Sequence, residues 1–215
     1  CIPSKTFLHV AKALFAADDL AEFGVTFTGK TVDVDKLRAK KNTVVDGLAK
    51  GLRFLTNKRD IQFINGQASF AANDTISITS ETDEPISLTF EHAIIAAGSR
   101  PARIPAAIDS PKVIDSTGAL AMEKVPNSML VVGGGYIGVE LGQVYAALGA
   151  NVTLVEMAPN ILPGADRDLA RFLDARLENQ FKSILLGSKV TAMRDVADGV
   201  AVDIQTENGN ITETF

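Results

Sequence analysis

Two stretches near the start of the chain repeat their apolar residues at the three- to four-residue spacing of one helix face. The first covers residues 4–17, and its stripe consists of Phe7, Leu8, Ala11, Leu14 and Phe15. The second covers residues 33–58, and its stripe consists of Leu37, Val44, Val45, Leu48, Leu52 and Leu55. The pattern predicts a helix over each stretch, and on the second it leaves Lys40, Lys41 and Lys50 in solvent.

Short segments with alternating or continuous apolar residues follow, and these predict strands. They cover residues 61–64, 68–71, 75–79 and 86–91, and the turn-forming residues between them favour a small antiparallel meander. The next run, residues 93–97, is apolar without interruption and is followed directly by Gly98. Such a run is typical of a strand buried on both faces, although a buried helical turn has the same pattern.

The second half of the chain alternates strand-like and helix-like patterns. A strand over residues 129–132 leads into three glycines, a helix that Gly149 ends, and a strand over 152–155. Asp166 is placed to cap a further helix. Short strands then cover residues 184–186, 189–193, 200–205 and 211–215. This order predicts an α/β fold with a parallel sheet and right-handed crossovers, and we expect two domains, over residues 1–110 and 111–215.

Composition and charge exclude several classes of protein. The 215 residues are 46% hydrophobic and 22% charged, which is ordinary for a globular chain. The net charge of −5, without a basic block, argues against a nucleic-acid surface. We expect no membrane span, because the longest uncharged runs are rich in glycine, and no metal site, because two histidines and one cysteine lie far apart. A single cysteine fits a reducing compartment such as the cytoplasm.

The strand over residues 129–132 ends in the pattern Gly133-x-Gly135-x-x-Gly138, directly before a helix. The first glycine permits a tight turn, the second lets a diphosphate approach the backbone, and the third lets the helix pack close to the strand. The N–H groups at the helix start attract the phosphates. Glu156 ends the next strand, 23 positions after Gly133, where a carboxylate can accept hydrogen bonds from both ribose hydroxyls of an adenosine. The combination predicts a dinucleotide site.

Glu156 also bears on the choice between NAD and NADP. A carboxylate repels a 2′-phosphate, and residues 157–161 contain no arginine or lysine to pair with one. The sequence therefore favours NAD. The alternative is a tight turn without a ligand, with Glu156 as a surface carboxylate.

Cys1 stands at the start of the first predicted helix, with Lys5 one turn later. A helix N-terminus and a nearby ammonium group favour the thiolate, the form that carries redox or nucleophilic chemistry. A cysteine without a chemical role is the alternative. Because the sequence begins with Cys1 rather than methionine, and ends directly after a predicted strand, we expect it to be an internal part of a longer protein.

Three strings that occur in order resemble those of the dihydrolipoamide dehydrogenases, which are flavoprotein disulfide reductases: CIPSK at 1–5, AIIAAGSRP at 93–101 and GGGYIGVELG at 133–142. VTLVEM at 152–157 and ADRDL at 165–169 are similar to the same family. The likeness spans essentially the whole chain. It implies a Rossmann-like FAD/NAD(P)-binding fold, with part of a FAD domain in residues 1–110 and a NAD domain, incomplete at its C-terminal end, in residues 111–215.

The resemblance also implies roles for individual residues. Cys1 matches the flavin-side cysteine of a redox-active disulfide whose other cysteine lies outside this chain. Lys5 matches a lysine beside the flavin, and Glu140 matches the glutamate that pairs with it. The residues placed at FAD are Lys5, Ala68, Ala97, Gly98 and Ser99, with Ala97 standing where threonine is commoner. The residues placed at NAD are Gly133, Gly134, Gly135, Tyr136, Ile137, Gly138, Glu140, Glu156 and Val190.

The activity implied is that of a dihydrolipoyl dehydrogenase, which oxidises protein-bound dihydrolipoamide by thiol–disulfide exchange and passes the electrons through FAD to NAD. The implied partners are the lipoyl domains of 2-oxo-acid dehydrogenase complexes and, in the full-length protein, a second copy in a homodimer. The chain lacks the family's FAD glycine motif, its other redox cysteine and its C-terminal interface domain, so we expect it to be inactive alone. The alternatives are another disulfide reductase, such as a mercuric reductase, and an NAD-binding fragment without activity.

Overall fold

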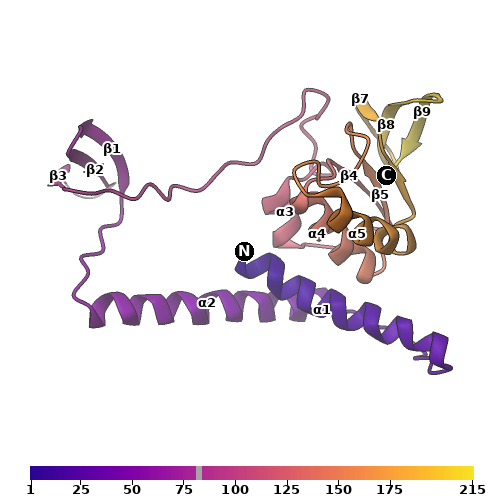
Figure 1. Ribbon diagram of the computed structural model, residues 1–215, viewed down its shortest axis with the longest axis horizontal. Coiled ribbons are helices and arrows are strands. Elements are labelled where there is room, and N and C mark those ends of the chain that lie inside the picture. Colours follow the sequence, from indigo (N-terminus) through magenta and orange to yellow (C-terminus); the bar gives the residue numbers. More distant parts are fainter. Residues whose placement is uncertain (81–83) are drawn as a thin grey trace. The chain divides into compact units, whose positions relative to one another are not determined.

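The computed structural model describes residues 1–80 and 84–215 (Figure 1). Contacts within the chain divide it into two units, one of Cys1–Val45 with Pro101–Phe215 and one of Asp46–Arg100. These boundaries reflect only the neighbours that each residue has inside this chain. The division into whole domains at residue 110 therefore stays a prediction.

The larger unit contains most of the regular structure. Its helices are α1 (Ile2–Asp19), the 3-10 turn Leu20–Phe23, the first part of α2 (Val34–Lys58), α3 (Ser116–Ala121), α4 (Tyr136–Ala147) and α5 (Arg167–Gln180). Its strands are β4 (Ser128–Val132), β5 (Asn151–Val155), β6 (Ser183–Leu185), β7 (Lys189–Val196), β8 (Gly199–Thr206) and β9 (Gly209–Thr214). The sequence predicted these strands and the four longer helices to within a few residues. It missed α3, whose six residues are too few to show a repeating apolar stripe.

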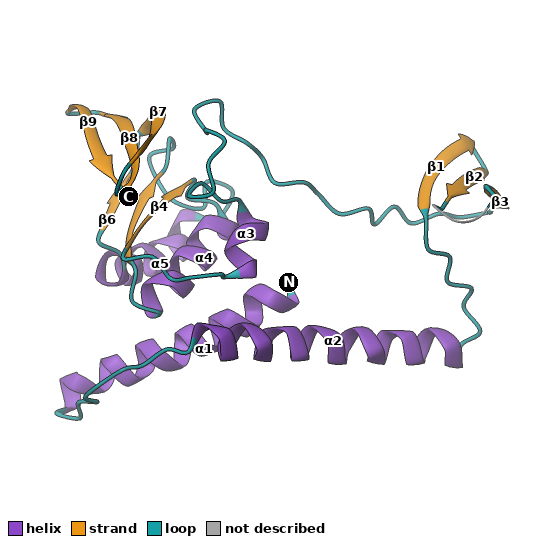
Figure 2. Ribbon diagram, turned by 180° about the vertical axis from the view of Figure 1, so that it is seen from behind, coloured by secondary structure: helices purple, strands orange, loops and turns teal. Residues whose placement is uncertain are grey.

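The larger unit has three layers: the helices, a parallel sheet and an antiparallel meander. This confirms the predicted α/β fold with a parallel sheet. Strands β4, β5 and β6 form that sheet in this order, and β7, β8 and β9 form an antiparallel meander (Figure 2). Alternate residues of β5 face opposite sides: Val152 and Leu154 join the core under the helices, whereas Val155 joins a second core under the meander. The period of two along a strand thus lets one sheet bury both faces.

The ends of the helices in this unit follow the sequence signals. Gly149 follows Leu148, the C-cap residue of α4, and has a φ of +111°, the left-handed conformation that glycine adopts without strain. Asp166 is the N-cap residue of α5, as predicted, although its side chain makes no capping hydrogen bond within the described part of the chain. Within the same described residues, no helix combines the length and the apolarity that crossing a bilayer requires.

Lys41 corrects the prediction for α2, because this side chain is buried rather than exposed. Only 9% of the residue is accessible, and its ammonium group lies 5.7 Å from the centre of the Phe7 ring on α1. The ammonium donates a hydrogen bond to the Leu120 carbonyl at 3.2 Å. The last carbonyl groups of a helix have no hydrogen-bond partner within that helix. In α3, one of these carbonyl groups accepts a hydrogen bond from a lysine that the sequence pattern places in solvent.

Other carbonyl groups at the end of α3 are also bound by side chains. Arg38 of α2 donates to the Met122 carbonyl at 3.0 Å, and the Tyr145 hydroxyl of α4 donates to the Ala119 carbonyl at 2.9 Å. Tyr145 is 1% exposed, and this burial raises the pKa of its phenol. The short helix is therefore held by side chains from both helices that flank it.

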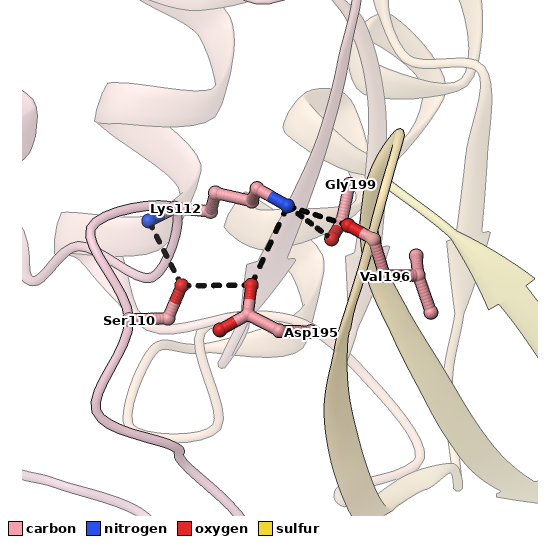
Figure 3. A network of polar contacts seen from close by, with 5 residues as sticks. All are labelled: Ser110, Lys112, Asp195, Val196 and Gly199. Atoms are coloured by element: carbon pink, nitrogen blue, oxygen red, sulfur yellow. Dashed lines mark hydrogen bonds and ion pairs between the residues drawn. The ribbon is translucent and has the colours of Figure 1, made fainter.

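The irregular connection that precedes α3 is fixed to the turn between β7 and β8. The Lys112 ammonium donates to the carbonyl groups of Val196 at 2.6 Å and Gly199 at 2.9 Å, and it lies 3.5 Å from the Asp195 carboxylate (Figure 3). The Ser110 hydroxyl donates to the same carboxylate at 3.0 Å. A segment without regular structure thus obtains a defined position from polar contacts with a neighbouring turn.

The smaller unit contains the rest of α2 and the predicted meander of β1 (Gln67–Ala72), β2 (Thr75–Thr79) and β3 (Ile86–Thr89). Two strand predictions are wrong, because residues 61–64 and 93–97 belong to no strand. Ile94 and Ile95 are 95% and 75% exposed, so a buried helical turn is wrong as well. A strand exists only through hydrogen bonds to neighbouring strands, and within the described residues none pairs with either run.

Candidate functional site

The glycine turn lies where β4 ends and α4 begins. Gly133 has a φ of +107°, and its N–H donates to the Val155 carbonyl of β5 at 2.8 Å. Gly138 lies against this turn, since a Cβ atom on it would come within 2.1 Å of the Gly133 carbonyl oxygen. Both positions therefore require glycine for reasons internal to the chain: a left-handed backbone at Gly133 and close helix packing at Gly138.

Gly135 is different, because nothing in the described chain requires it to be glycine. It is the N-cap residue of α4 with a φ of −71°, and a Cβ atom on it would meet no atom within 4 Å. Within the described residues no side chain caps this helix, so the N–H groups of its first turn are available to a ligand. Tyr136 and Ile137 are 69% and 46% exposed. The notch at Gly135 is thus open, and the positive end of a helix dipole lies behind it.

Glu156 ends β5 beside the glycine turn, and its carboxylate folds back onto backbone N–H groups. One oxygen accepts from the Gly134 N–H at 2.6 Å and the other from the Ala158 N–H at 2.7 Å. A carboxylate oxygen has two lone pairs, so each oxygen can accept a further hydrogen bond. The acid is therefore aimed at the turn and retains acceptors for the hydroxyl groups of a sugar.

A contact that the sequence did not indicate closes the loop after Glu156 onto the turn. The Leu162 N–H donates to the Gly134 carbonyl at 2.8 Å, and Leu162 has a φ of +47°. The Pro163–Gly164 dipeptide marks a turn here, but no sequence signal identifies the leucine before it. Both polar groups of Gly134 are thus bound, its N–H by Glu156 and its carbonyl by Leu162.

Helix α1 brings Lys5 to Glu140 of α4. The Lys5 ammonium donates to the Glu140 carboxylate, and the two side chains are 58% and 28% exposed. Cys1 is the N-cap residue of α1; it is exposed, and its thiol is free. Its carbonyl accepts from the Lys5 N–H at 3.0 Å and from the Ser4 hydroxyl at 3.2 Å. The two charged residues that the resemblance pairs are in contact, and their role beside a flavin stays a prediction.

The remaining candidate residues lie apart from the glycine turn in the chain. Val190 is in β7, is 6% exposed and packs with Val155 in the core under the meander. Ala68 is in β1, and residues 97–99 are exposed and irregular, with a φ of +74° at Gly98. Within the described residues, no group of three or more histidine, cysteine or acidic side chains could hold a metal ion.

The residues present fit one dinucleotide. The open notch, the uncapped start of α4 and the Glu156 carboxylate supply the contacts that a dinucleotide needs for its diphosphate and ribose. The sequence has a single Gly-x-Gly-x-x-Gly pattern, so it offers no second turn of this kind for the FAD diphosphate. The residues of this chain therefore do not form a complete FAD site.

Comparisons with known proteins give matches over nearly the whole chain. The family model described as pyridine nucleotide-disulphide oxidoreductase matches residues 1–214. Proteins named dihydrolipoyl dehydrogenase from Vibrio cholerae and Haemophilus influenzae are each 38% identical to the chain, over 95% and 100% of its length. The chain covers 43% and 45% of those proteins.

A solved structure is similar as well. The HOCl-induced flavoprotein disulfide reductase RclA from Escherichia coli matches 99% of the chain with a TM-score of 0.73 and 28% sequence identity. The chain covers 44% of that protein. It therefore spans less than half the length of each of these relatives.

Proposed function

The chain belongs to the pyridine nucleotide-disulphide oxidoreductase family, and from this we propose that it is the part of a dihydrolipoyl dehydrogenase that binds NAD and carries the flavin-side cysteine. The whole protein oxidises protein-bound dihydrolipoamide, and its partners are the lipoyl domains of 2-oxo-acid dehydrogenase complexes. It acts in the cytoplasm as a homodimer. The support for these statements is the 38% identity to proteins named dihydrolipoyl dehydrogenase together with the open glycine turn.

The observation that carries the proposal is the notch at Gly135. A diphosphate that enters it contacts backbone N–H groups without meeting a side chain, and the helix dipole of α4 favours its charge. The Glu156 carboxylate binds the adenosine ribose and repels a 2′-phosphate, which selects NAD over NADP. Bound NAD supplies a nicotinamide ring that accepts hydride. On the resemblance alone, Tyr136, which is exposed at the start of α4, covers that ring, and the Val190 backbone contacts the adenine.

The residues of α1 prepare the thiol chemistry. Cys1 is the flavin-side thiol in this proposal, and its side chain is exposed and free. The Lys5 ammonium donates a hydrogen bond to the Glu140 carboxylate, and this contact joins α1 to α4. Ala68, Ala97, Gly98 and Ser99 complete the residues assigned to FAD, on the resemblance alone.

Replacing Gly135 by alanine tests the proposal without disturbing the fold. The backbone at Gly135 suits any residue and the space beside it is open, so the free energy of unfolding should change little. The added methyl group occupies the notch, so we expect the dissociation constant for NAD to rise at least about tenfold, as measured by calorimetric titration. Gly47→Ala, at an open helical position in α2, is the matched control and should leave NAD binding unchanged.

A second substitution tests the choice of nucleotide. Glu156→Arg should weaken NAD binding and improve NADP binding, because it replaces a repelling carboxylate with a cation that can pair with the 2′-phosphate. Titration of each variant with both nucleotides measures the exchange. Unchanged affinity for both nucleotides would remove Glu156 from the site, and unchanged NAD binding in Gly135→Ala would remove the notch.

A further inference from the structure

Arg167 lies outside the residues assigned to NAD, yet it holds the loop that closes on the glycine turn. It is the first residue of α5. One guanidinium nitrogen donates to the Ile161 carbonyl at 2.9 Å, and another donates to the Asp174 carboxylate at 2.7 Å, two helical turns further along α5. The fork of the guanidinium group lets one side chain bind both partners at once, which fixes the end of the loop to the helix.

The Ile161 carbonyl belongs to the same peptide group as the Leu162 N–H, and this N–H donates to the Gly134 carbonyl. Leu162 is held in a left-handed conformation that leucine rarely adopts, so its surroundings must impose it. Ile161 is 1% exposed, which anchors one side of this peptide group in the core. Arg167 thus binds the carbonyl of the peptide group whose N–H contacts the glycine turn.

The Gly134 carbonyl in turn belongs to the peptide group that carries the Gly135 N–H. No peptide bond among the described residues is cis, so the carbonyl and the N–H of each group point in opposite directions. Since Leu162 holds the Gly134 carbonyl toward the loop, the Gly135 N–H points away from the loop. Hydrogen bonds in a chain also polarise one another, so a cation at one end strengthens the last donor.

We infer that Arg167 is a positioning residue for the diphosphate of the bound dinucleotide. It acts through two peptide groups in series, 161–162 and 134–135, and the last of these presents the Gly135 N–H to an anion. Asp174 holds the guanidinium in place for this task. The inference rests on the proposed function, because it assigns a residue to the NAD site proposed at Gly135.

The test compares two ligands that share the adenosine but differ in the diphosphate. Arg167→Met removes both hydrogen bonds and keeps the length of the side chain. We expect its dissociation constant for NAD to rise about three- to tenfold, the effect of one net hydrogen bond, and its dissociation constant for adenosine to stay unchanged. Arg167→Lys keeps the charge but loses the forked guanidinium group, so its dissociation constant for NAD should lie between those of Arg167→Met and the parent.

Arg171→Met is the matched control, since Arg171 lies on the same helix and its guanidinium contacts only the Phe172 ring, at 5.0 Å, among the described residues. It should bind both ligands like the parent. Hydrogen exchange gives a second measurement: the Leu162 amide should exchange faster in Arg167→Met and not in Arg171→Met.

The outcomes separate the two proposals. Weaker binding of NAD alone, with faster exchange at Leu162, supports the role of Arg167. Equal weakening of NAD and adenosine would show general disruption of the unit and overturn it, as would unchanged NAD affinity. Failure of the unmodified protein to bind NAD would overturn the proposed function and this inference together, whereas the other two adverse results leave the proposed function standing.

Discussion

Two short, mainly apolar runs of this chain differ completely in burial. Residues 152–155 lie in β5, where Val152 and Leu154 are fully buried between β4 and β6. Residues 93–97 are apolar throughout, yet they form no strand, and Ile94 is 95% exposed. The more apolar run is the exposed one, so the difference lies in the neighbours: β4 and β6 lie within the same chain, while no described strand pairs with residues 93–97.

The two parts of α2 repeat this lesson. Leu37, Val44 and Val45 are partly buried, and Leu37 packs on the core of the larger unit. Leu48 and Leu52, which continue the same apolar stripe, are 50% and 64% exposed. An amphipathic pattern therefore identifies a helix and the face that it could bury, but burial itself requires a partner surface.

The largest expected effect comes from shortening one side chain in each apolar run. Leu154→Ala should lower the free energy of unfolding by about 2–5 kcal/mol, because it leaves a cavity in a packed core. Ile95→Ala should change it by less than about 0.5 kcal/mol, because the side chain is already in solvent. Urea unfolding of both variants provides the measurement. Equal losses in the two variants would show that residues 93–97 are buried in solution and would end the comparison.

The second prediction concerns the irregular connection that precedes α3 and that Lys112 fixes to the turn between β7 and β8. Lys112→Met removes the ammonium that binds the Val196 and Gly199 carbonyl groups, and we expect a loss of about 1 kcal/mol in urea unfolding, since the site is partly open to water. Limited proteolysis should also cleave the connection around Ser110 faster in this variant than in the parent. Lys124→Met, at an exposed lysine without an ion pair among the described residues, is the control and should match the parent.

The smallest expected effect concerns how the stability of the meander β7–β9 depends on pH. In β7–β9, hydrogen bonds from Arg194, at 2.5 and 2.8 Å, and from Thr212, at 2.7 Å, hold the pKa of Asp203 well below its usual value. A carboxyl group whose pKa is lower in the folded state stabilises the fold above its unfolded-state pKa of about 4, and it loses this contribution as the pH falls through its folded-state pKa.

Asp203→Asn should therefore destabilise the chain near neutral pH and narrow its difference from the parent below about pH 4, measured as unfolding midpoints in urea across that range. Asp198→Asn, in the turn between β7 and β8, has no charged partner among the described residues and should leave the pH profile unchanged. A difference between Asp203→Asn and the parent that stays constant with pH would contradict the assigned ion pair.

Local sequence determined the elements whose signals are local. Periodicity placed α1, α2, α4 and α5, alternation placed the strands of both meanders, and the positive φ values at Gly133 and Gly149 lie where glycine stands. The glycine pattern and the acid 23 residues after Gly133 located the candidate nucleotide site, because a strand, a tight turn and a helix in succession leave little freedom for its geometry.

Tertiary structure decided everything that depends on contacts distant in sequence. It buried Lys41 against α3, left residues 93–97 in solvent, and joined Arg167 to the glycine turn through Ile161 and Leu162. None of these outcomes has a local signal, since a carbonyl at the end of another helix or a missing neighbouring strand is a property of the fold. The sequence pattern indicates which surface a segment can bury and which hydrogen-bond donors it carries. The neighbours in three dimensions determine whether that surface is buried and whether those donors are used.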